Sequence, residues 1–220
     1  MIVLALLRAS HFGPTVLVTT IAFFAANFEF SAFESIQISL AIFAGQLVVG
    51  WSNDVIDYPL DRAANRVKKP LVAGEISLQL LQRLIPIALL TAALLSAIGP
   101  LGLSGTLVHL LGLLSATAYN LKLKSTIFSP LPYIISFGAL PWAIFLAAGT
   151  TPPLWLYLAL ALFTTAFHFL NVVKDLQWDI EQGVLGLPQR IGKTRSLSTA
   201  SVLVIAGLLT CASAGALGIV

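Results

Sequence analysis

The sequence predicts an all-α integral membrane protein: a bundle of about seven transmembrane helices with a cytoplasmic N-terminus and two aspartate-rich motifs on the cytoplasmic side. Three observations support this prediction. Hydrophobic residues make up 58% of the 220 residues and charged residues only 10%, whereas about a quarter of an ordinary soluble domain is charged. The apolar residues form long segments, and the basic residues gather in alternate connections between these segments.

The apolar segments are each about as long as a helix that crosses a bilayer. They cover residues 11–28, 36–55, 77–98, 101–121, 131–148, 153–173 and 197–220. Turn signals separate them, such as the Gly99-Pro100 pair between the third and fourth segments. Because little length remains for a separate soluble domain, we expect residues 1–220 to form one transmembrane domain. The residues before Arg8 are apolar but few, and no cleavage site follows them, so we expect no cleaved signal peptide.

The basic residues orient the bundle, because Lys and Arg are retained on the cytoplasmic side of short loops. They lie before the first segment, between the second and third or just inside the third, between the fourth and fifth, and between the sixth and seventh: Arg8, Arg62, Arg66, Lys68, Lys69, Arg83, Lys122, Lys124, Lys174, Arg190, Lys193 and Arg195. The other connections hold none. We therefore expect a protein of the cell (inner) membrane, surrounded by lipid, with its active face toward the cytoplasm and no nucleic-acid partner.

The first aspartate cluster, NDVIDYPLD, ends the second apolar segment. Asp54, Asp57 and Asp61 are spaced i, i+3 and i+7, which places their carboxylates on one helical face. Pro59 interrupts the motif. Because proline disfavours a continuous helix, we expect Asp61 on a bent or unwound continuation.

The second cluster, NVVKDLQWD, ends the sixth apolar segment and contains the remaining two aspartates of the chain. Asn171, Asp175 and Asp179 are spaced i, i+4 and i+8, again on one helical face. Each cluster is followed by a basic loop. Both clusters are therefore expected at the same, cytoplasmic, edge of the membrane.

Acids at helix ends have a simple alternative explanation. Solvated carboxylates can lie near basic loops because the acidic and basic side chains neutralise each other. That explanation suffices for one aspartate. Like charges one turn apart destabilise a helix, and acids close to hydrocarbon are costly, so the clusters require a cation. Carboxylates with a side-chain amide favour a hard divalent ion such as Mg²⁺, which completes its shell with water and substrate phosphate. The sequence therefore predicts a phosphorylated ligand held through Mg²⁺.

The two motifs resemble those of the UbiA superfamily of intramembrane prenyltransferases, which have the forms NDxxDxxxD and DxxxD. The flanking stretches DRAANRVKKPLVAGEIS and GVLGLPQRIG are similar to the family's sequences after each motif. Tyr119 and Lys122 in TAYNLKLKS resemble a fourth-helix tyrosine and lysine of the family, and Arg8 stands where members often have an N-terminal arginine. The resemblance covers nearly the whole chain.

This resemblance implies Mg²⁺-dependent transfer of a prenyl group from a prenyl diphosphate to a lipophilic or aromatic acceptor. It implies one set of metal ligands and catalytic carboxylates: Asp54, Asp57, Asp61, Asp175 and Asp179. It implies a second set that contacts the diphosphate or orients the ligands: Asn53, Arg62, Lys69, Lys122, Asn171 and Arg8. Tyr119 is expected either to shield a carbocation or to be a core tyrosine with a satisfied hydroxyl.

The chain also departs from the family pattern. Members commonly have nine spans, and Lys69 stands where an arginine usually precedes the proline. Small residues of the last segment, Gly207 and Gly215 among them, are therefore expected on a face that docks against a second copy or a partner subunit, with direct lipid contact as the alternative. The rival functions are a terpene cyclase of the same family, an ion-coupled transporter and an inactive assembly subunit.

Overall fold

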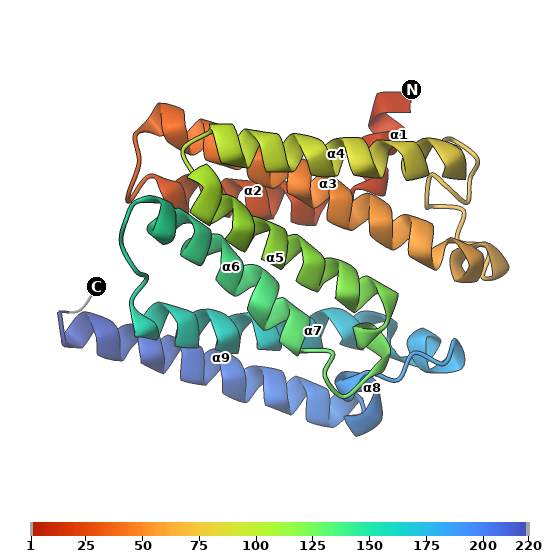
Figure 1. Ribbon diagram of the computed structural model, residues 1–220. Coiled ribbons are helices and arrows are strands. Elements are labelled where there is room, and N and C mark those ends of the chain that lie inside the picture. Colours follow the sequence, from red (N-terminus) through yellow and green to blue (C-terminus); the bar gives the residue numbers. More distant parts are fainter. Residues whose placement is uncertain (1, 219–220) are drawn as a thin grey trace. The chain divides into compact units, whose positions relative to one another are not determined.

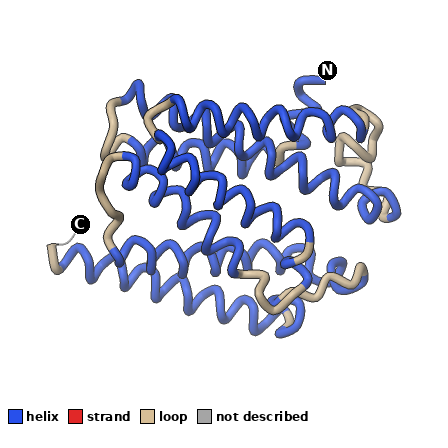
Figure 2. The backbone as a smooth tube through the Cα atoms, viewed as in Figure 1, coloured by secondary structure: helices blue, strands red, loops and turns tan. Residues whose placement is uncertain are grey.

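The chain folds into helices joined by short loops, as Figures 1 and 2 show for the computed structural model. The structure describes residues 2–218, and within this range it has nine α-helices, one short 3-10 helix and no strand. The helices are α1 (Ile2–Ala9), α2 (Phe12–Ala26), α3 (Ala32–Ala63), α4 (Leu78–Ile98), α5 (Gly102–Leu121), η1 (Leu123–Ser125), α6 (Leu131–Ala147), α7 (Leu154–Glu181), α8 (Leu187–Ile191) and α9 (Lys193–Ala216). The predicted all-α class is confirmed.

Each apolar segment of the sequence overlaps one long helix, from α2 for the first segment to α9 for the last. In the described part of the chain, five helices are long and apolar enough to cross a membrane: α3, α4, α5, α7 and α9. Helices α1 and α2 meet at 72° and together make a sixth candidate span, whereas α6 is a shorter apolar helix of 17 residues. The number of spans and the orientation of the N-terminus stay predictions.

Cysteine labelling tests the predicted orientation. In a Cys211→Ala background, single cysteines placed at Lys68, Lys122 and Arg190 are expected to react with an impermeant thiol reagent only from the cytoplasmic side, because basic loops are retained there. A cysteine at Thr151 is expected to react only from the opposite side. Labelling of position 151 from the cytoplasm would contradict the seven-span arrangement.

Helix α3 carries the first aspartate motif and continues through Pro59 to Ala63. The expected unwinding at Asp61 is therefore wrong. The missing N–H of one proline does not end the helix, whose C-terminus is closed by a backbone hydrogen bond from Arg66 N to Asp61 O at 3.0 Å. A helix of 32 residues is about 48 Å long, whereas the hydrocarbon core of a bilayer is about 30 Å thick. The helix is therefore long enough for its aspartate-bearing end to extend beyond the hydrocarbon core into the membrane–water interface.

Helix α7 carries the second motif. It extends beyond the apolar segment that ends at residue 173 and stops at Glu181, so Asp175 and Asp179 both lie on the helix. Its 28 residues also exceed the roughly 20 that a span requires. The helical spacing predicted for this motif is therefore confirmed.

The chain divides into two compact units. Unit 1 comprises Met1–Leu113 and Leu140–Thr150, and unit 2 comprises Leu114–Ala139 and Thr151–Val220. Helices α5 and α6 each contribute one part to each unit. The first aspartate motif belongs to unit 1 and the second to unit 2. One domain over residues 1–220 stays a prediction.

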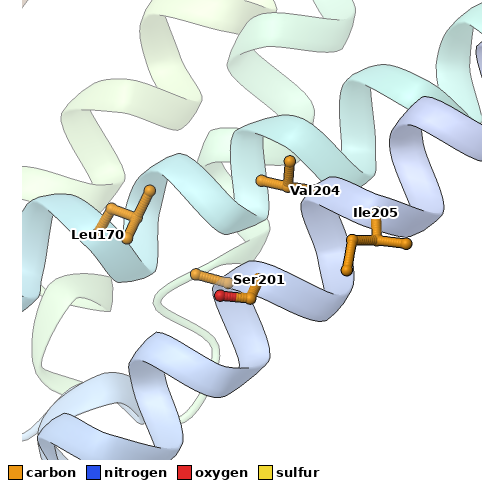
Figure 3. Close-up of a pocket in the computed structure, with 5 residues that line it drawn as sticks. Leu170, Ser201, Val204 and Ile205 are labelled. Atoms are coloured by element: carbon orange, nitrogen blue, oxygen red, sulfur yellow. The ribbon is translucent and has the colours of Figure 1, made fainter.

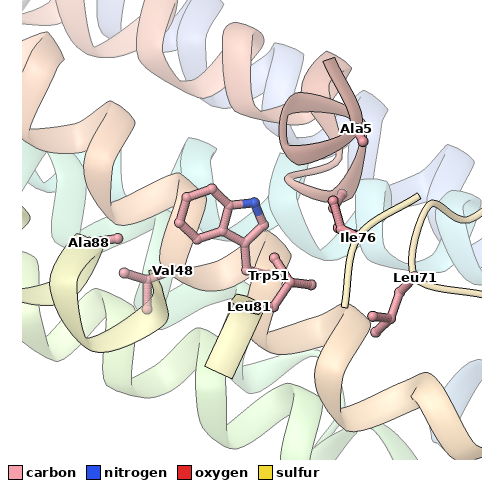
Figure 4. Close-up of a cluster of buried hydrophobic side chains, with 8 residues drawn as sticks. Ala5, Val48, Trp51, Leu71, Ile76, Leu81 and Ala88 are labelled. Carbon is pink, nitrogen blue, oxygen red and sulfur yellow. The ribbon is translucent and has the colours of Figure 1, made fainter. Parts of the chain in front are cut away.

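In unit 1, a hydrophobic cluster packs the loop between α3 and α4 against α1, α3 and α4 (Figure 4). Its buried members are Ala5, Ala9, Val48, Trp51, Leu71, Ile76, Leu81 and Ala88. The indole N–H of Trp51 donates to the carbonyl of Leu6 at 2.9 Å, so the buried ring keeps its hydrogen bond. Because Leu71 and Ile76 belong to this cluster, the loop that also carries Lys69 is fixed on the end of α3.

The junction between α1 and α2 lies directly on α3 at Gly50. A Cβ atom at Gly50 would stand 2.4 Å from the carbonyl oxygen of Ser10 and 2.6 Å from its Cα, so only glycine permits this approach. The same carbonyl accepts a hydrogen bond from the hydroxyl of Thr15 at 2.7 Å. The close contact brings His11, the next residue of the junction, to the aspartate-bearing part of α3.

In unit 2, α7 and α9 lie side by side. Buried Ala166, Phe169 and Ala200 form their common core. Gly207 also belongs to this contact, because a Cβ there would stand 2.7 Å from the ring of Phe163. The expectation that Gly207 lies on an unpartnered outer face is therefore wrong: this small residue serves packing inside the unit.

An apolar pocket lies along the same two helices (Figure 3). It is lined by Leu170, Ala200, Ser201, Val204 and Ile205. None of these side chains carries a charge, so this pocket does not have the groups that a diphosphate requires.

Candidate functional site

The three aspartates of the first motif lie on the last turns of α3 in unit 1. Asp54 and Asp61 are buried, with exposed fractions of 3% and 1%. Asp57 is half-buried and accepts a hydrogen bond from the side-chain amide of Asn53 at 3.1 Å. Asn53 therefore orients one carboxylate of the motif, which is one of the two roles expected for it.

Lys69 joins the two buried carboxylates. Its Nζ lies 3.0 Å from Asp54 Oδ1 and 2.6 Å from Asp61 Oδ2. Burial by itself would lower the pKa of Lys69, but the neighbouring Asp54 and Asp61 outweigh it and raise this pKa above its ordinary value of 10.5. A raised pKa means that the charge of Lys69 stabilises the fold at neutral pH, and that this contribution is lost as the pH rises above about 10.5.

His11 is a third partner of these acids. Its Nε2 lies 3.2 Å from Asp54 Oδ1, and its backbone has a left-handed conformation with φ of 56°. A non-glycine residue in this region is strained by roughly 1–2 kcal/mol, which the close packing of the junction on α3 offsets. Sequence reasoning missed His11, because nothing local to it indicates a contact with a residue 43 positions away.

The arginines expected at the diphosphate have different surroundings. Arg8 donates to both carboxylate oxygens of Glu75 at 2.9 Å and to the carbonyl of Lys68 at 2.9 Å, so it ties α1 to the loop after α3. Arg62, which adjoins Asp61 in sequence, is exposed. The guanidinium nearer to Asp61 is that of Arg66, at 3.6 Å from Oδ1. Contact of Arg8 or Arg62 with a diphosphate stays a prediction.

The acids of α3 suit Mg²⁺ by their chemistry. Among the described residues, no three His, Cys, Asp or Glu side chains form a group that could hold a metal on its own. This fits Mg²⁺, which takes one or two carboxylates and fills its remaining positions with water and phosphate oxygens. Oδ1 of Asp61 is buried and accepts no hydrogen bond from the described residues, and the Arg66 guanidinium, 3.6 Å away, lies beyond hydrogen-bond distance.

The second motif, in unit 2, is more open. Asp175 is exposed and Asp179 is half-buried. Asp179 Oδ2 accepts a hydrogen bond from the side-chain amide of Gln189 on α8 at 2.8 Å. Helix α8 is itself held by Ser129, whose hydroxyl accepts from the backbone N–H of Leu187 at 3.1 Å. The basic loop after α7 thus folds back to position the last aspartate.

Tyr133 connects two of the expected residues of unit 2. Its hydroxyl shares hydrogen bonds with Tyr119 and Asn171, and the rings of Tyr119 and Tyr133 meet edge to face with centroids 5.2 Å apart. The ring of buried His168 lies 4.6 Å from that of Tyr133. Tyr119 therefore has a satisfied hydroxyl inside an aromatic cluster. Lys122 is exposed at the end of α5.

Comparison with known proteins places these two motifs in a family. The model of the UbiA prenyltransferase family matches residues 12–220. The chain belongs to this family. The resemblance inferred from the aspartate motifs and their flanks is confirmed, and the protein is a prenyltransferase of the membrane.

Solved structures of UbiA homologues share this fold. One from Archaeoglobus fulgidus, bound to GPP and Mg²⁺, has 19% sequence identity and a TM-score of 0.79 over 95% of this chain and 77% of that one. The apo structure from Aeropyrum pernix K1 has 22% identity and a TM-score of 0.78 over 94% and 80%. A structure of digeranylgeranylglyceryl phosphate synthase has 22% identity and a TM-score of 0.72 over 99% and 79%. No curated protein matches the chain.

Proposed function

We propose that this UbiA-family enzyme transfers a prenyl group, with Mg²⁺, from a prenyl diphosphate to a lipophilic or aromatic acceptor inside the membrane. The observation that carries the proposal is a complete set of motif aspartates, on α3 and α7, in a chain that matches the family over residues 12–220. The homologue bound to GPP and Mg²⁺ supports the choice of substrate class and metal.

The motif residues divide the metal-binding task between them. Asp54, Asp57 and Asp61 would supply the carboxylates for one Mg²⁺, one or two of them at a time with water and phosphate completing the shell, and Asp175 and Asp179 would supply those for another. When bound, the metal supplies Lewis-acid charge that stabilises the leaving diphosphate. On the protein side, Asn53 keeps the carboxylate of Asp57 oriented through its 3.1 Å hydrogen bond, and Gln189 does the same for Asp179.

The basic side chains provide the remaining positive charge. Arg62 and Lys122 are exposed at the ends of α3 and α5, where a flexible cation can reach a phosphate oxygen. Lys69 contacts the first motif, and Arg8 binds the loop that carries Lys69. Charge that these groups place near the leaving diphosphate lowers the barrier to breaking the allylic C–O bond. The freed allylic carbon then bonds to the acceptor, and the acceptor loses a proton.

The aromatic cluster of unit 2 is suited to stabilise the allylic cation that forms when the diphosphate leaves. Faces of Tyr119 and Tyr133 attract positive charge, and the apolar surroundings exclude water that would quench an allylic cation. The hydrogen bonds that Tyr119 and Asn171 make with the Tyr133 hydroxyl hold the two rings in place. Asn171 is thus proposed to link the cluster to Asp175, one turn further along α7.

Product analysis tests this function. Membranes containing the protein receive Mg²⁺ and a panel of prenyl diphosphates of increasing chain length, and lipid extracts are examined by mass spectrometry with a chelator-treated sample as control. We expect diphosphate release together with a prenylated product, both lost with chelator. A cyclised hydrocarbon formed without acceptor would indicate the terpene cyclase instead. Consumption of none of the substrates would contradict both and favour an inactive assembly subunit.

A further inference from the structure

The two buried carboxylates of the first motif already have a cation between them. Lys69 Nζ lies 3.0 Å from Asp54 Oδ1 and 2.6 Å from Asp61 Oδ2, so one ammonium bridges both acids. Two carboxylates buried this deeply require a counter-charge. In this structure, Lys69 provides it.

The backbone of Lys69 is held in place from several directions. Arg8 binds the carbonyl of the preceding residue, Lys68, at 2.9 Å. The N–H of Lys69 donates to the carbonyl of Arg66 at 2.9 Å, and Leu71 is buried in the core of unit 1. With the backbone fixed, only the side chain is free to move. The fold therefore holds the backbone of Lys69 beside Asp54 and Asp61. The flexible part of the ion pair is the four-carbon stem of Lys69 that carries the ammonium.

A divalent ion that binds these two oxygens competes with Lys69 for them. Mg²⁺ contacts its oxygen ligands at about 2.1 Å, and an ammonium within hydrogen-bond distance of the same two oxygens would repel it at close range. Binding of one cation at these oxygens therefore weakens binding of the other. His11 Nε2 lies 3.2 Å from Asp54 Oδ1, the oxygen that Lys69 also contacts, and the Arg66 guanidinium lies 3.6 Å from Asp61 Oδ1. These two groups remain beside the carboxylates during the exchange.

We propose that Lys69 is an internal counter-ion, which takes the place of a divalent cation between Asp54 and Asp61 and which that cation must displace. This inference rests on the proposed function, because it assigns the metal to these two carboxylates. The displaced ammonium keeps its charge and becomes available to an anion, such as a phosphate group of the substrate. Metal loading and phosphate binding are thereby coupled through one side chain.

Metal affinity measures the competition directly. Mn²⁺, which suits oxygen ligands as Mg²⁺ does, is titrated into the purified full-length protein and free Mn²⁺ is followed by electron paramagnetic resonance. Lys69→Met retains the apolar stem and removes the charge. It is expected to tighten Mn²⁺ binding about tenfold or more, a normal size for the coupling between two competing ligands, and to lower the metal-free unfolding midpoint. Lys68→Met, one residue away and exposed, is the matched control and should change neither.

Amine labelling tests the same exchange in the unmodified protein, so it remains decisive if Lys69→Met does not fold. Acetylation of Lys69 by a water-soluble reagent, quantified by peptide mass spectrometry, is expected to be slow without metal and at least about fivefold faster with saturating Mn²⁺. Lys68 should be labelled equally in both conditions.

The possible results distinguish a failure of this inference from a failure of the proposed function. Tighter Mn²⁺ binding by Lys69→Met and faster labelling of Lys69 with metal both support it. If both proteins bind Mn²⁺ equally well, or if labelling of Lys69 does not respond to bound metal, the inference is wrong and the metal site stands. If neither protein binds Mn²⁺, the proposed metal site itself fails.

Discussion

Asp57→Asn and Asp175→Asn are each expected to lose turnover by at least about 100-fold, since even groups that only orient a metal ligand cost about 10–100-fold when removed. Each substitution keeps the size and shape of the side chain and removes the negative charge that the metal requires. The loss is measured as product formed from a prenyl diphosphate in membranes, with protein amount checked by immunoblot.

The same variants are expected to fold normally. Asp57 is half-buried, and an amide oxygen in its place can still accept the hydrogen bond from Asn53. Asp54 and Asp61 lie one turn away on either side, so removing the charge at position 57 also relieves repulsion between like charges. The unfolding midpoint of the metal-free Asp57→Asn protein should therefore be no lower than that of the parent.

Glu181→Gln provides the matched control for the second motif. Glu181 is an exposed acid on the same helix as Asp175, and it accepts a hydrogen bond from Gln177 at 3.0 Å. Its neutralisation should leave turnover unchanged. Normal turnover by both aspartate variants would show that the two motifs are not the catalytic site.

The helical elements of the site follow from the sequence because they depend on local periodicity. A spacing of three residues places Asp54 and Asp57 on one helical face. A spacing of four residues does the same for Asp175 and Asp179 on α7. The helical register of Asp61, beyond Pro59, is known only from the structure. The family motif adds the metal and substrate class, since its residue types are specified position by position.

The partners of these acids do not follow from the sequence, because they depend on loops. The contact of His11 with Asp54 requires a left-handed residue between α1 and α2. Arg62 is the sequence neighbour of Asp61, but the chain turns after α3 and brings Arg66 and Lys69 to that carboxylate. Loop conformation is set by distant packing, which single-sequence patterns do not contain.

Small residues illustrate a second limit. A glycine on a membrane helix indicates close packing, but the residue itself does not specify the neighbour. Gly207 was expected at an outer interface, and its neighbour is Phe163 of the same unit. No sequence pattern distinguishes Gly50, yet a Cβ there would stand only 2.4 Å from the carbonyl oxygen of Ser10.

Gly50→Ala is therefore expected to destabilise the protein substantially. The added Cβ would stand 2.4 Å, 2.5 Å and 2.6 Å from the carbonyl oxygen, carbonyl carbon and Cα of Ser10. These are backbone atoms and cannot rotate away as a side chain would. The Ser10 carbonyl is also held by the hydroxyl of Thr15 at 2.7 Å, so the whole junction of α1 and α2 must move off α3.

The size of the effect follows from two opposing contributions. Alanine in place of glycine within a helix favours the fold by up to about 1 kcal/mol, whereas overpacking a close contact costs about 1–3 kcal/mol and occasionally more. Overpacking should dominate here because both sides of the contact are backbone. Gly13→Ala separates the two contributions, since no atom outside the local helix lies within 4 Å of a Cβ at that position.

Thermal unfolding of both variants in detergent provides the measurement. We expect a lower midpoint for Gly50→Ala and an unchanged or slightly higher one for Gly13→Ala. Because a displaced junction also carries His11 away from Asp54 and weakens the 2.9 Å hydrogen bond between Trp51 and Leu6, turnover of Gly50→Ala should fall even below its unfolding temperature. Equal midpoints for the two variants would show that α1 and α2 adjust to the extra methyl group without cost, and that the first motif does not depend on this contact.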